Sequence, residues 1–245
     1  MSLSGKVALI TGSSQGIGKA TALRLASEGA SLVINYRSDS AAANSVVEQI
    51  GPDRALAVQA DASKLPDLDR LVEATVARFG KIDILILNAG ILAMKDLENT
   101  TEEDFDNSHN LMVKGPYFLA QKAAKHMPRG GRIIFVSTSL NAVSSIAPAY
   151  LLYVSTKGAI EQISRVLAKD LGRRGILVNA IAPGPTSTEL FMEGKSEQIL
   201  KAIAGSNPFG RIGEPQEIAA VMLFLAGEDS SWMSGQVVRV NGAMA

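Results

Sequence analysis

Short apolar runs alternate with longer segments of helical periodicity along the whole chain. The short runs are rich in β-branched residues and apolar at successive positions, which predicts strands buried on both faces. We expect these strands at 6–11, 31–36, 54–59, 82–87, 132–137, 176–181 and 236–241. The periodicity between them predicts helices at 16–28, 40–50, 65–79, 101–126, 150–171 and 215–226. This alternation predicts a single-domain α/β chain over residues 1–245: a Rossmann-like, doubly wound fold with a seven-stranded parallel sheet flanked by helices.

Composition narrows the function classes. The 24 basic residues balance the 24 acidic ones, which argues against a nucleic-acid or anionic-membrane partner. The absence of cysteine excludes disulfides and thiolate metal sites, and two histidines, His109 and His126, are too few for a histidine-rich metal site. No apolar run is long enough to span a bilayer, and the N-terminus does not read as a secretory signal. We therefore expect a cytoplasmic protein.

A glycine-rich turn follows the first predicted strand. It runs from Thr11 to Gly18 with the spacing G-x-x-x-G-x-G and leads into an Ala-rich helical segment. Gly12 permits the sharp turn, Gly16 lets backbone N–H groups approach a pyrophosphate, and Gly18 allows close packing of the helix. The helix N-terminus then faces the phosphates with unpaired N–H groups. The turn predicts a dinucleotide site whose further contacts are Ser14, Gln15 and Ile17.

The end of the second predicted strand indicates which dinucleotide binds. An acidic residue at this position would accept hydrogen bonds from the ribose 2′-hydroxyl of NAD, but the sequence is Asn35-Tyr36-Arg37-Ser38. Arg37 and Ser38 can instead bind a 2′-phosphate, because a guanidinium group matches phosphate oxygens. A solvated surface arginine is the ordinary alternative. The missing acid favours NADP(H) over NAD(H), with Tyr36, Arg37 and Ser38 as cofactor-binding residues.

Candidate chemistry lies early in the helix after the fifth strand. Tyr153 and Lys157 are four residues apart, which places the phenol and the ammonium on one helix face. A free tyrosine ionises near pH 10, and a neighbouring positive charge lowers that pKa. Such a phenol can give a proton to a carbonyl oxygen or take one from an alcohol. Alone, such a pair is weak evidence, since most Tyr/Lys pairs on helices are solvated surface.

Together these features resemble the short-chain dehydrogenase/reductase family over nearly the whole chain. Thr11–Gly18 matches the family's glycine motif and Tyr153 with Lys157 its Y-x-x-x-K motif. The resemblance implies that Asp61 contacts adenine and that Thr188 binds the nicotinamide carboxamide. The family's N-N-A-G motif is matched in part, with Leu87 in place of the first Asn. The implied cofactor-binding residues are Asp61, Ala62, Asn88, Ala89, Gly90, Tyr153, Lys157, Pro183, Gly184, Thr186 and Thr188.

The family's catalytic serine has two candidates in this sequence. It follows the fifth strand, where it polarises the substrate carbonyl. Counting six residues from Arg132 selects Thr138, whereas counting back 14 residues from Tyr153 selects Ser139. Either hydroxyl can donate the hydrogen bond. We prefer Ser139, with Thr138 as the second candidate, and expect Ser137 to end the strand.

One position departs sharply from the family. An Asn three residues before a glycine normally completes a tetrad with the serine, tyrosine and lysine. Here Met112 stands three residues before Gly115. Asn110 lies about 200° around a helix from that position and cannot replace it. The alternative is that Met112 fills the core and the position works through its main-chain carbonyl.

The resemblance implies an NADP-dependent oxidoreductase acting on CH–OH and C=O groups. It would reduce a ketone, aldehyde or quinone carbonyl to an alcohol, with Tyr153 as general acid and Lys157 lowering its pKa and binding the nicotinamide ribose. Two alternatives stay open. One is a 3-oxoacyl-carrier-protein reductase, which should need a basic patch that is not evident here. The other is a catalytically impaired dinucleotide-binding protein, because of Met112.

The resemblance also divides the domain. Residues 1–90 would mainly bind the cofactor, and residues 130–245 would carry the catalytic residues and a substrate lid at about 189–207. The apolar residues of the lid indicate an apolar or cyclic small-molecule substrate, and four further residues support this: Leu140, Val143, Tyr150 and Trp232. The alternative is that these side chains fill the core. The family's fourth and fifth helices commonly pack against a second copy. This implies a homo-oligomer, a tetramer or a dimer.

Overall fold

The strands form one sheet in which every neighbouring pair is parallel. A computed structural model describes residues 2–245. The strand order is β3-β2-β1-β4-β5-β6-β7, so the winding reverses between β1 and β4. This confirms the doubly wound seven-stranded sheet. The strands are β1 (Val7–Ile10), β2 (Ser31–Tyr36), β3 (Ala55–Gln59), β4 (Ile84–Leu87), β5 (Arg132–Val136), β6 (Leu177–Pro183) and β7 (Val237–Val240).

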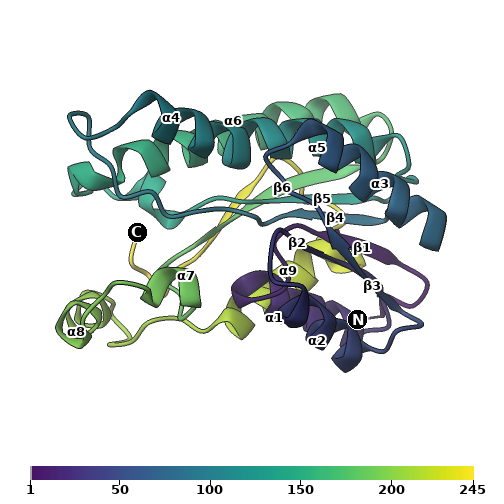
Figure 1. Cartoon of the computed structure of the whole chain (residues 1–245), viewed down its shortest axis with the longest axis horizontal. Helices are drawn as coiled ribbons and strands as arrows, with labels where there is room; N and C mark the ends of the chain where they lie inside the picture. The colour runs from purple at the N-terminus through teal and green to yellow at the C-terminus, as the bar shows by residue number, and fades with distance from the viewer. Residues whose placement is uncertain (1) are drawn as a thin grey trace.

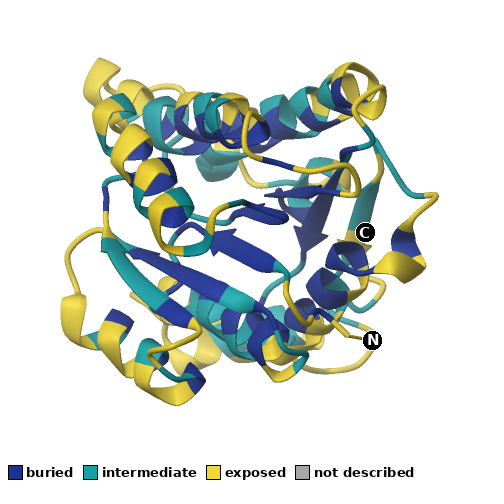
Figure 2. Cartoon of the chain, turned by 90° about the vertical axis from the view of Figure 1, so that its right-hand side faces the viewer, coloured by how far each residue is buried: buried dark blue, intermediate teal, exposed yellow. Residues whose placement is uncertain are grey.

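Helices cover both faces of the sheet (Figure 1). One layer comprises α1 (Gly16–Ser27), α2 (Ser40–Ile50) and α9 (Pro215–Ala226). The other comprises α3 (Leu65–Phe79), α4 (Glu102–His109), α5 (Gly115–Ala124) and α6 (Leu151–Gly172). An apolar cluster fills the space on each side of the sheet; the central strands are buried, the edge strands β3 and β7 mostly half-buried, and the outer helix faces exposed (Figure 2). Strands covered on both faces explain the continuous apolar runs of the sequence.

The helix expected over 101–126 is interrupted. It begins as predicted, because the Thr101 side chain accepts a hydrogen bond from the Asp104 amide while the Asp104 carboxylate accepts one from the Thr101 amide. A π-helical turn, Asn110–Lys114, then separates α4 from α5, and α5 ends at Ala124. Gly115 follows this turn and lies so close to the Ala62 carbonyl that a Cβ would overlap its oxygen. The wider turn thus accompanies a close approach that periodicity alone does not indicate.

The segment expected to form a lid contains two short helices that the sequence did not predict. They are α7 (Glu189–Met192) and α8 (Glu197–Gly205), which lie beyond the edge of the sheet (Figure 1). Each is capped by a side chain: Thr188 accepts from the Phe191 amide and Ser196 from the Ile199 amide. Helices this short carry too few turns for a periodic signal. No helix among residues 2–245 is long and apolar enough to cross a membrane.

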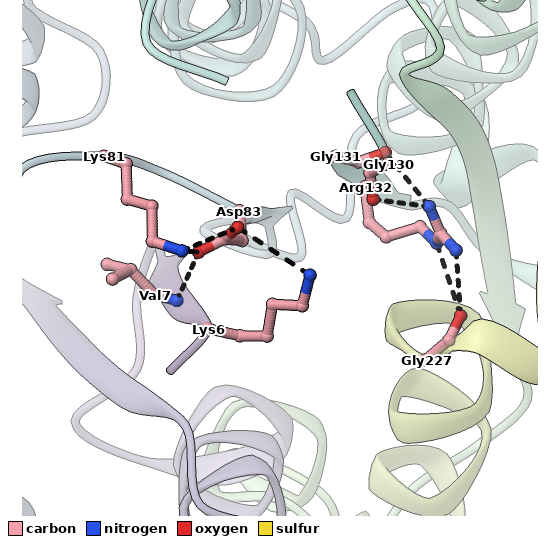
Figure 3. A network of polar contacts seen from close by, with 8 residues as sticks. All are labelled: Lys6, Val7, Lys81, Asp83, Gly130, Gly131, Arg132 and Gly227. Atoms are coloured by element: carbon pink, nitrogen blue, oxygen red, sulfur yellow. Dashed lines mark hydrogen bonds and ion pairs between the residues drawn. The ribbon is translucent and has the colours of Figure 1, made fainter. Parts of the chain in front are cut away.

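Two groups of polar contacts, around Asp83 and around Arg132, hold the chain at the amino ends of β1, β4 and β5 (Figure 3). The buried Asp83 carboxylate accepts a hydrogen bond from the Val7 amide at 2.8 Å and pairs with Lys81 at 3.0 Å. The Arg132 guanidinium donates to the Gly130 carbonyl at 2.6 Å and the Gly227 carbonyl at 3.1 Å. Because these contacts occupy the amino edge, the carboxyl edge is the one left to build a cavity, as is usual in open parallel sheets.

Candidate active site

A cavity of about 810 Å³ opens at the carboxyl ends of the strands. Its wall comes from the glycine turn, the loops after β2, β3 and β4, the end of β5, α6 and the lid segment. Gly18 alone among the predicted site residues lies outside the wall. The structure brings all the others together in that wall: Gly12, Ser14, Gln15, Gly16, Ile17, Tyr36, Arg37, Ser38, Asp61, Ala62, Asn88, Ala89, Gly90, Thr138, Ser139, Tyr153, Lys157, Pro183, Gly184, Thr186 and Thr188.

The glycine turn has the backbone that its sequence predicts. Gly12 and Gly16 have φ values of 61° and 55°, which favour glycine, and a Cβ on Gly12 would lie 3.1 Å from the Ala89 Cα atom. A Cβ on Gly18 would collide with the Gly12 carbonyl, so this glycine serves packing rather than ligand contact. The side chain of the N-cap residue, Gln15, makes no capping hydrogen bond. The first turn of α1 therefore presents its amides to the cavity, as an anion site requires.

Asn35 is a site residue that sequence reasoning missed. Its buried side chain accepts a hydrogen bond from the Gly12 amide at 3.1 Å and donates to the Ala60 carbonyl at 2.9 Å. Ser13 exchanges two further hydrogen bonds with its backbone. Asn35 thus fixes the glycine turn against β2 and β3. The sequence does hold a signal for this role, because an amide side chain at the end of the second strand can both accept from and donate to neighbouring backbone.

Thr11 and Asn88 hold the other side of the same turn. The Thr11 hydroxyl accepts hydrogen bonds from the Asn88 and Ala89 amides, both at 3.0 Å. The Asn88 side chain donates to the carbonyls of Thr11 and Gly12 at 2.9 and 3.0 Å. Leu87, the departure from the family motif, is buried in the core. The side-chain hydrogen bonds that this motif gives to the turn come from Asn88, which matches the motif's second Asn.

Arg37 and Asp61 lie at the end of the cavity next to β2 and β3. Arg37 is exposed and lines the wall. Partial burial opposes ionisation of Asp61, but hydrogen bonds from Ser63 and the positive charge of Arg37 outweigh it and lower the pKa of Asp61. The Asp61 carboxylate accepts from the Ser63 amide at 2.9 Å and its hydroxyl at 2.7 Å. This end of the cavity carries the exposed guanidinium of Arg37 and the carboxyl groups of Asp39 and Asp61.

Tyr153 and Lys157 lie at the opposite end, where α6 packs against the end of β5. Lys157 is buried and Tyr153 is half-buried, and the Lys157 Nζ atom donates a hydrogen bond to the Val136 carbonyl at 2.7 Å. The ammonium lies 5.8 Å from the centre of the Tyr153 ring. The predicted shared helix face is therefore observed, and it faces the cavity.

The protonation of this pair differs from the expectation. Burial raises the pKa of Tyr153 to about 12, against the opposing effect of a hydrogen bond with Thr138. Burial also lowers the pKa of Lys157 to about 8. In the free protein the phenol pKa is therefore raised by burial, not lowered by the lysine as was expected. At neutral pH the phenol is protonated and the lysine is charged.

The structure brings Thr138, the second candidate, to the phenol. The Thr138 hydroxyl hydrogen-bonds the Tyr153 phenol. Ser139 is buried at the start of the 3₁₀ turn Ser139–Ala142 and lines the cavity, but no hydrogen bond among residues 2–245 joins its side chain to Tyr153. The preference for Ser139 rested on a fixed spacing to Tyr153. The hydrogen bond to the phenol favours Thr138, the residue that the count from the strand selects.

Met112 is buried in the π-helical turn beside Lys157. Its sulfur lies 4.0 Å from the Thr156 hydroxyl. A Cβ on Gly90 would lie 3.6 Å from both the Met112 sulfur and the Lys157 Nζ atom, which places the thioether and the ammonium on the same side of Gly90. The turn keeps its irregular backbone although the tetrad amide is absent. A flexible, unbranched methionine fills this gap by packing.

Apolar side chains dominate the far wall of the cavity. Leu140, Val143 and Tyr150 line it, as expected, together with the lid residue Phe191. Trp232 does not: it is 99% exposed and lies neither in the cavity wall nor in the core. The expectation that Trp232 contacts substrate or fills the core is therefore wrong.

Comparison with known proteins identifies the class. A family model of short-chain dehydrogenases, described as Enoyl-(Acyl carrier protein) reductase, matches residues 12–244. The chain is 42% identical to the hydroxynaphthalene reductase-like protein Arp2 of Metarhizium brunneum, covering 98% of this chain and 95% of that protein. It is similar in structure to angucycline C-6 ketoreductase LanV with bound NADP (TM-score 0.92, 38% identity, 99% and 96% covered). A Burkholderia cenocepacia short-chain dehydrogenase in complex with NADP gives a TM-score of 0.94 at 33% identity, with 100% and 99% covered.

The fold and the cavity define an oxidoreductase that acts on carbonyl or hydroxyl groups. The protein belongs to the short-chain dehydrogenase/reductase family.

The buried ammonium of Lys157 makes the stability of the free protein depend on pH. Its pKa falls from the ordinary 10.5 to about 8 on folding, so the unfolded chain binds more protons between these values. The free energy of unfolding should therefore rise from about pH 8 to pH 10, relative to that of Lys157→Met. Denaturant unfolding of both proteins measures this, with the exposed Lys169→Met as control. A difference that stays constant with pH contradicts the buried charge.

Proposed function

We propose that the protein is an NADPH-dependent reductase of apolar cyclic carbonyl compounds, such as aromatic ketones and quinones, with Tyr153 as general acid. The observation that carries this proposal is a protonated phenol, half-buried and hydrogen-bonded by Thr138, at the end of a cavity that begins at a glycine turn. The names of the relatives support it, because one is a hydroxynaphthalene reductase-like protein and one a ketoreductase with bound NADP.

The cavity fits a phosphorylated dinucleotide. The open amides of α1 suit the pyrophosphate, and a Cβ on Gly16 would contact the Thr188 methyl group at 3.3 Å, so the lid begins directly over the glycine turn. Arg37 and Ser38 would hold the 2′-phosphate, because β2 ends without an acid and the carboxylate of the next lining residue, Asp39, caps α2 by accepting from the Ala42 amide. Lys157 would bind the nicotinamide ribose and Thr188 the carboxamide. The bound cofactor supplies the hydride for the carbonyl carbon.

Tyr153 provides the proton. Its pKa of about 12 keeps the phenol protonated at neutral pH, which suits a group that donates to the oxygen of a carbonyl under reduction. Thr138 hydrogen-bonds the phenol and orients the substrate oxygen, in the role for which Ser139 was first preferred. Lys157, charged at neutral pH, stabilises negative charge that develops on the phenol oxygen.

The apolar wall selects the substrate. Leu140, Val143, Tyr150 and Phe191 offer no charged group to a ligand, so a flat apolar ring is favoured over a charged one. Residues 1–90 mainly hold the cofactor, and residues 130–245 carry the reacting groups and the lid at 189–207.

Exposed apolar side chains on α4, α5 and α6, among them Phe105, Tyr117 and Val166, support a homo-oligomer. Tetramer and dimer are distinguished by sedimentation.

Removal of the phenol oxygen tests the role of Tyr153 as general acid. Tyr153→Phe should lower kcat by about 10²- to 10⁴-fold, because the proton donor is lost, while the Kd for NADPH changes little. Thr138→Val should also lower kcat, and Ser139→Ala, the matched control, should stay within about twofold of wild type. NADPH oxidation with a panel of quinones, aryl ketones and acyl thioesters measures these rates. Near wild-type turnover in Tyr153→Phe excludes the assignment, and a response to acyl thioesters alone favours the carrier-protein alternative.

Arg37 tests the cofactor preference. Arg37→Ala should weaken NADPH binding by about 1.5–3 kcal/mol, the effect of losing a charge-assisted hydrogen bond. NADH binding should change little, because NADH has no 2′-phosphate. Fluorescence titration of both cofactors gives the two Kd values, and Arg24→Ala on the surface of α1 is the control. An equal rise in Kd for NADPH and NADH would contradict the proposed contact between Arg37 and the 2′-phosphate.

A further inference from the structure

Glu161 lies one helical turn beyond the catalytic pair. Tyr153, Lys157 and Glu161 are spaced i, i+4, i+8 and therefore share one face of α6. Tyr153 and Lys157 line the cavity, whereas Glu161 does not. Its carboxylate cannot touch a ligand there. Any effect on the reaction must pass through the residues that Glu161 contacts.

Three successive residues at the end of β5 are each bonded to one residue of this face. The Val136 carbonyl accepts from Lys157 at 2.7 Å, and the Ser137 hydroxyl donates to the Glu161 Oε1 atom at 2.7 Å. Thr138 hydrogen-bonds the Tyr153 phenol. The two residues before Thr138, and Thr138 itself, are thus each hydrogen-bonded to α6.

The same carboxylate oxygen of Glu161 also holds the far side of Thr138. It accepts a hydrogen bond from the Asn141 side chain at 2.9 Å, and that amide also approaches the Ser137 hydroxyl at 3.3 Å. Asn141 belongs to the 3₁₀ turn that starts directly after Thr138, and its amide N–H donates to the Thr138 carbonyl at 3.4 Å. One acceptor on α6 therefore fixes the residues before and after Thr138.

The other hydrogen bonds at this turn are mostly local or longer: the Leu140 amide donates to the Thr138 hydroxyl at 3.3 Å, and the Ser137 hydroxyl approaches the Lys157 carbonyl at 3.4 Å. Residues 144, 145, 147 and 148, between the turn and α6, are exposed to solvent. Ser137 is almost fully buried, so losing its acceptor would leave a buried hydroxyl without its shortest hydrogen bond. A carboxylate is suited to this position because it accepts two donors at once and offers none.

We propose that Glu161 is a positioning residue, which sets the Thr138 hydroxyl against the Tyr153 phenol through Ser137 and Asn141. This rests on the proposed carbonyl reduction, in which that hydroxyl orients the substrate oxygen. Glu161 acts entirely through Thr138, so its effect on the rate should vanish when the Thr138 hydroxyl is absent.

A double-mutant cycle tests this coupling. Glu161→Ala should lower kcat by about tenfold or more, with less than about a twofold change in the Kd for NADPH, because the glycine turn is untouched. In the Thr138→Val background the same substitution should lower kcat by less than about twofold. Glu161→Gln should recover most of the rate, since its amide oxygen still accepts. Asp170→Ala, which removes an exposed carboxylate from the same helix, should behave as wild type.

Thermal unfolding of each variant accompanies the kinetics. If Glu161→Ala does not fold, Ser137→Ala and Asn141→Ala remove the two donors separately and enter the same cycle with Thr138→Val. An equal loss of kcat with and without the Thr138 hydroxyl overturns the positioning role, while leaving the reductase active. A wild-type protein that reduces no carbonyl in the panel overturns the proposed function, and the positioning role with it.

Discussion

The active end of the molecule depends on how α6 is attached to the end of β5. The hydrogen bond from the Lys157 ammonium to the Val136 carbonyl, 2.7 Å long and buried, joins the helix to the strand at the cavity floor. An unpaired charge at this depth would be costly, so the carbonyl fixes where the ammonium lies. The position of Tyr153, one turn earlier on the same face, follows from that attachment.

The same burial sets the protonation of both groups. It raises the pKa of Tyr153 and lowers that of Lys157, which leaves a neutral phenol beside a charged ammonium near neutrality. That combination favours donation of a proton over its removal. The glycine turn at the other end of the cavity is equally constrained, because Asn35, Thr11 and Asn88 bond its backbone from two sides.

The sequence predicted the sheet and most helices because their signals are local. Apolar runs and periodicity define β2, α2 and α3 with the observed ends. It did not predict the π-helical turn at 110–114, which accompanies the approach of Gly115 to the distant Ala62 carbonyl. The spacing along the chain left Thr138 and Ser139 as alternatives, because the length of the loop before α6 is not read from a local pattern; the hydrogen bond to Tyr153 favours Thr138. Trp232 was misjudged because a large apolar side chain is usually covered, and here it is exposed.

We expect Tyr153 and Lys157 to support carbonyl reduction although Met112 occupies the tetrad position. Met112 is buried in the π-helical turn and supports it by packing. A pH–rate profile of wild type and Met112→Asn, with NADPH and one aryl ketone or quinone, tests this directly. We predict an active wild type and less than about a tenfold difference in kcat, or about 1.4 kcal/mol. A wild type that binds NADPH but reduces nothing, with turnover only in Met112→Asn, would contradict the account.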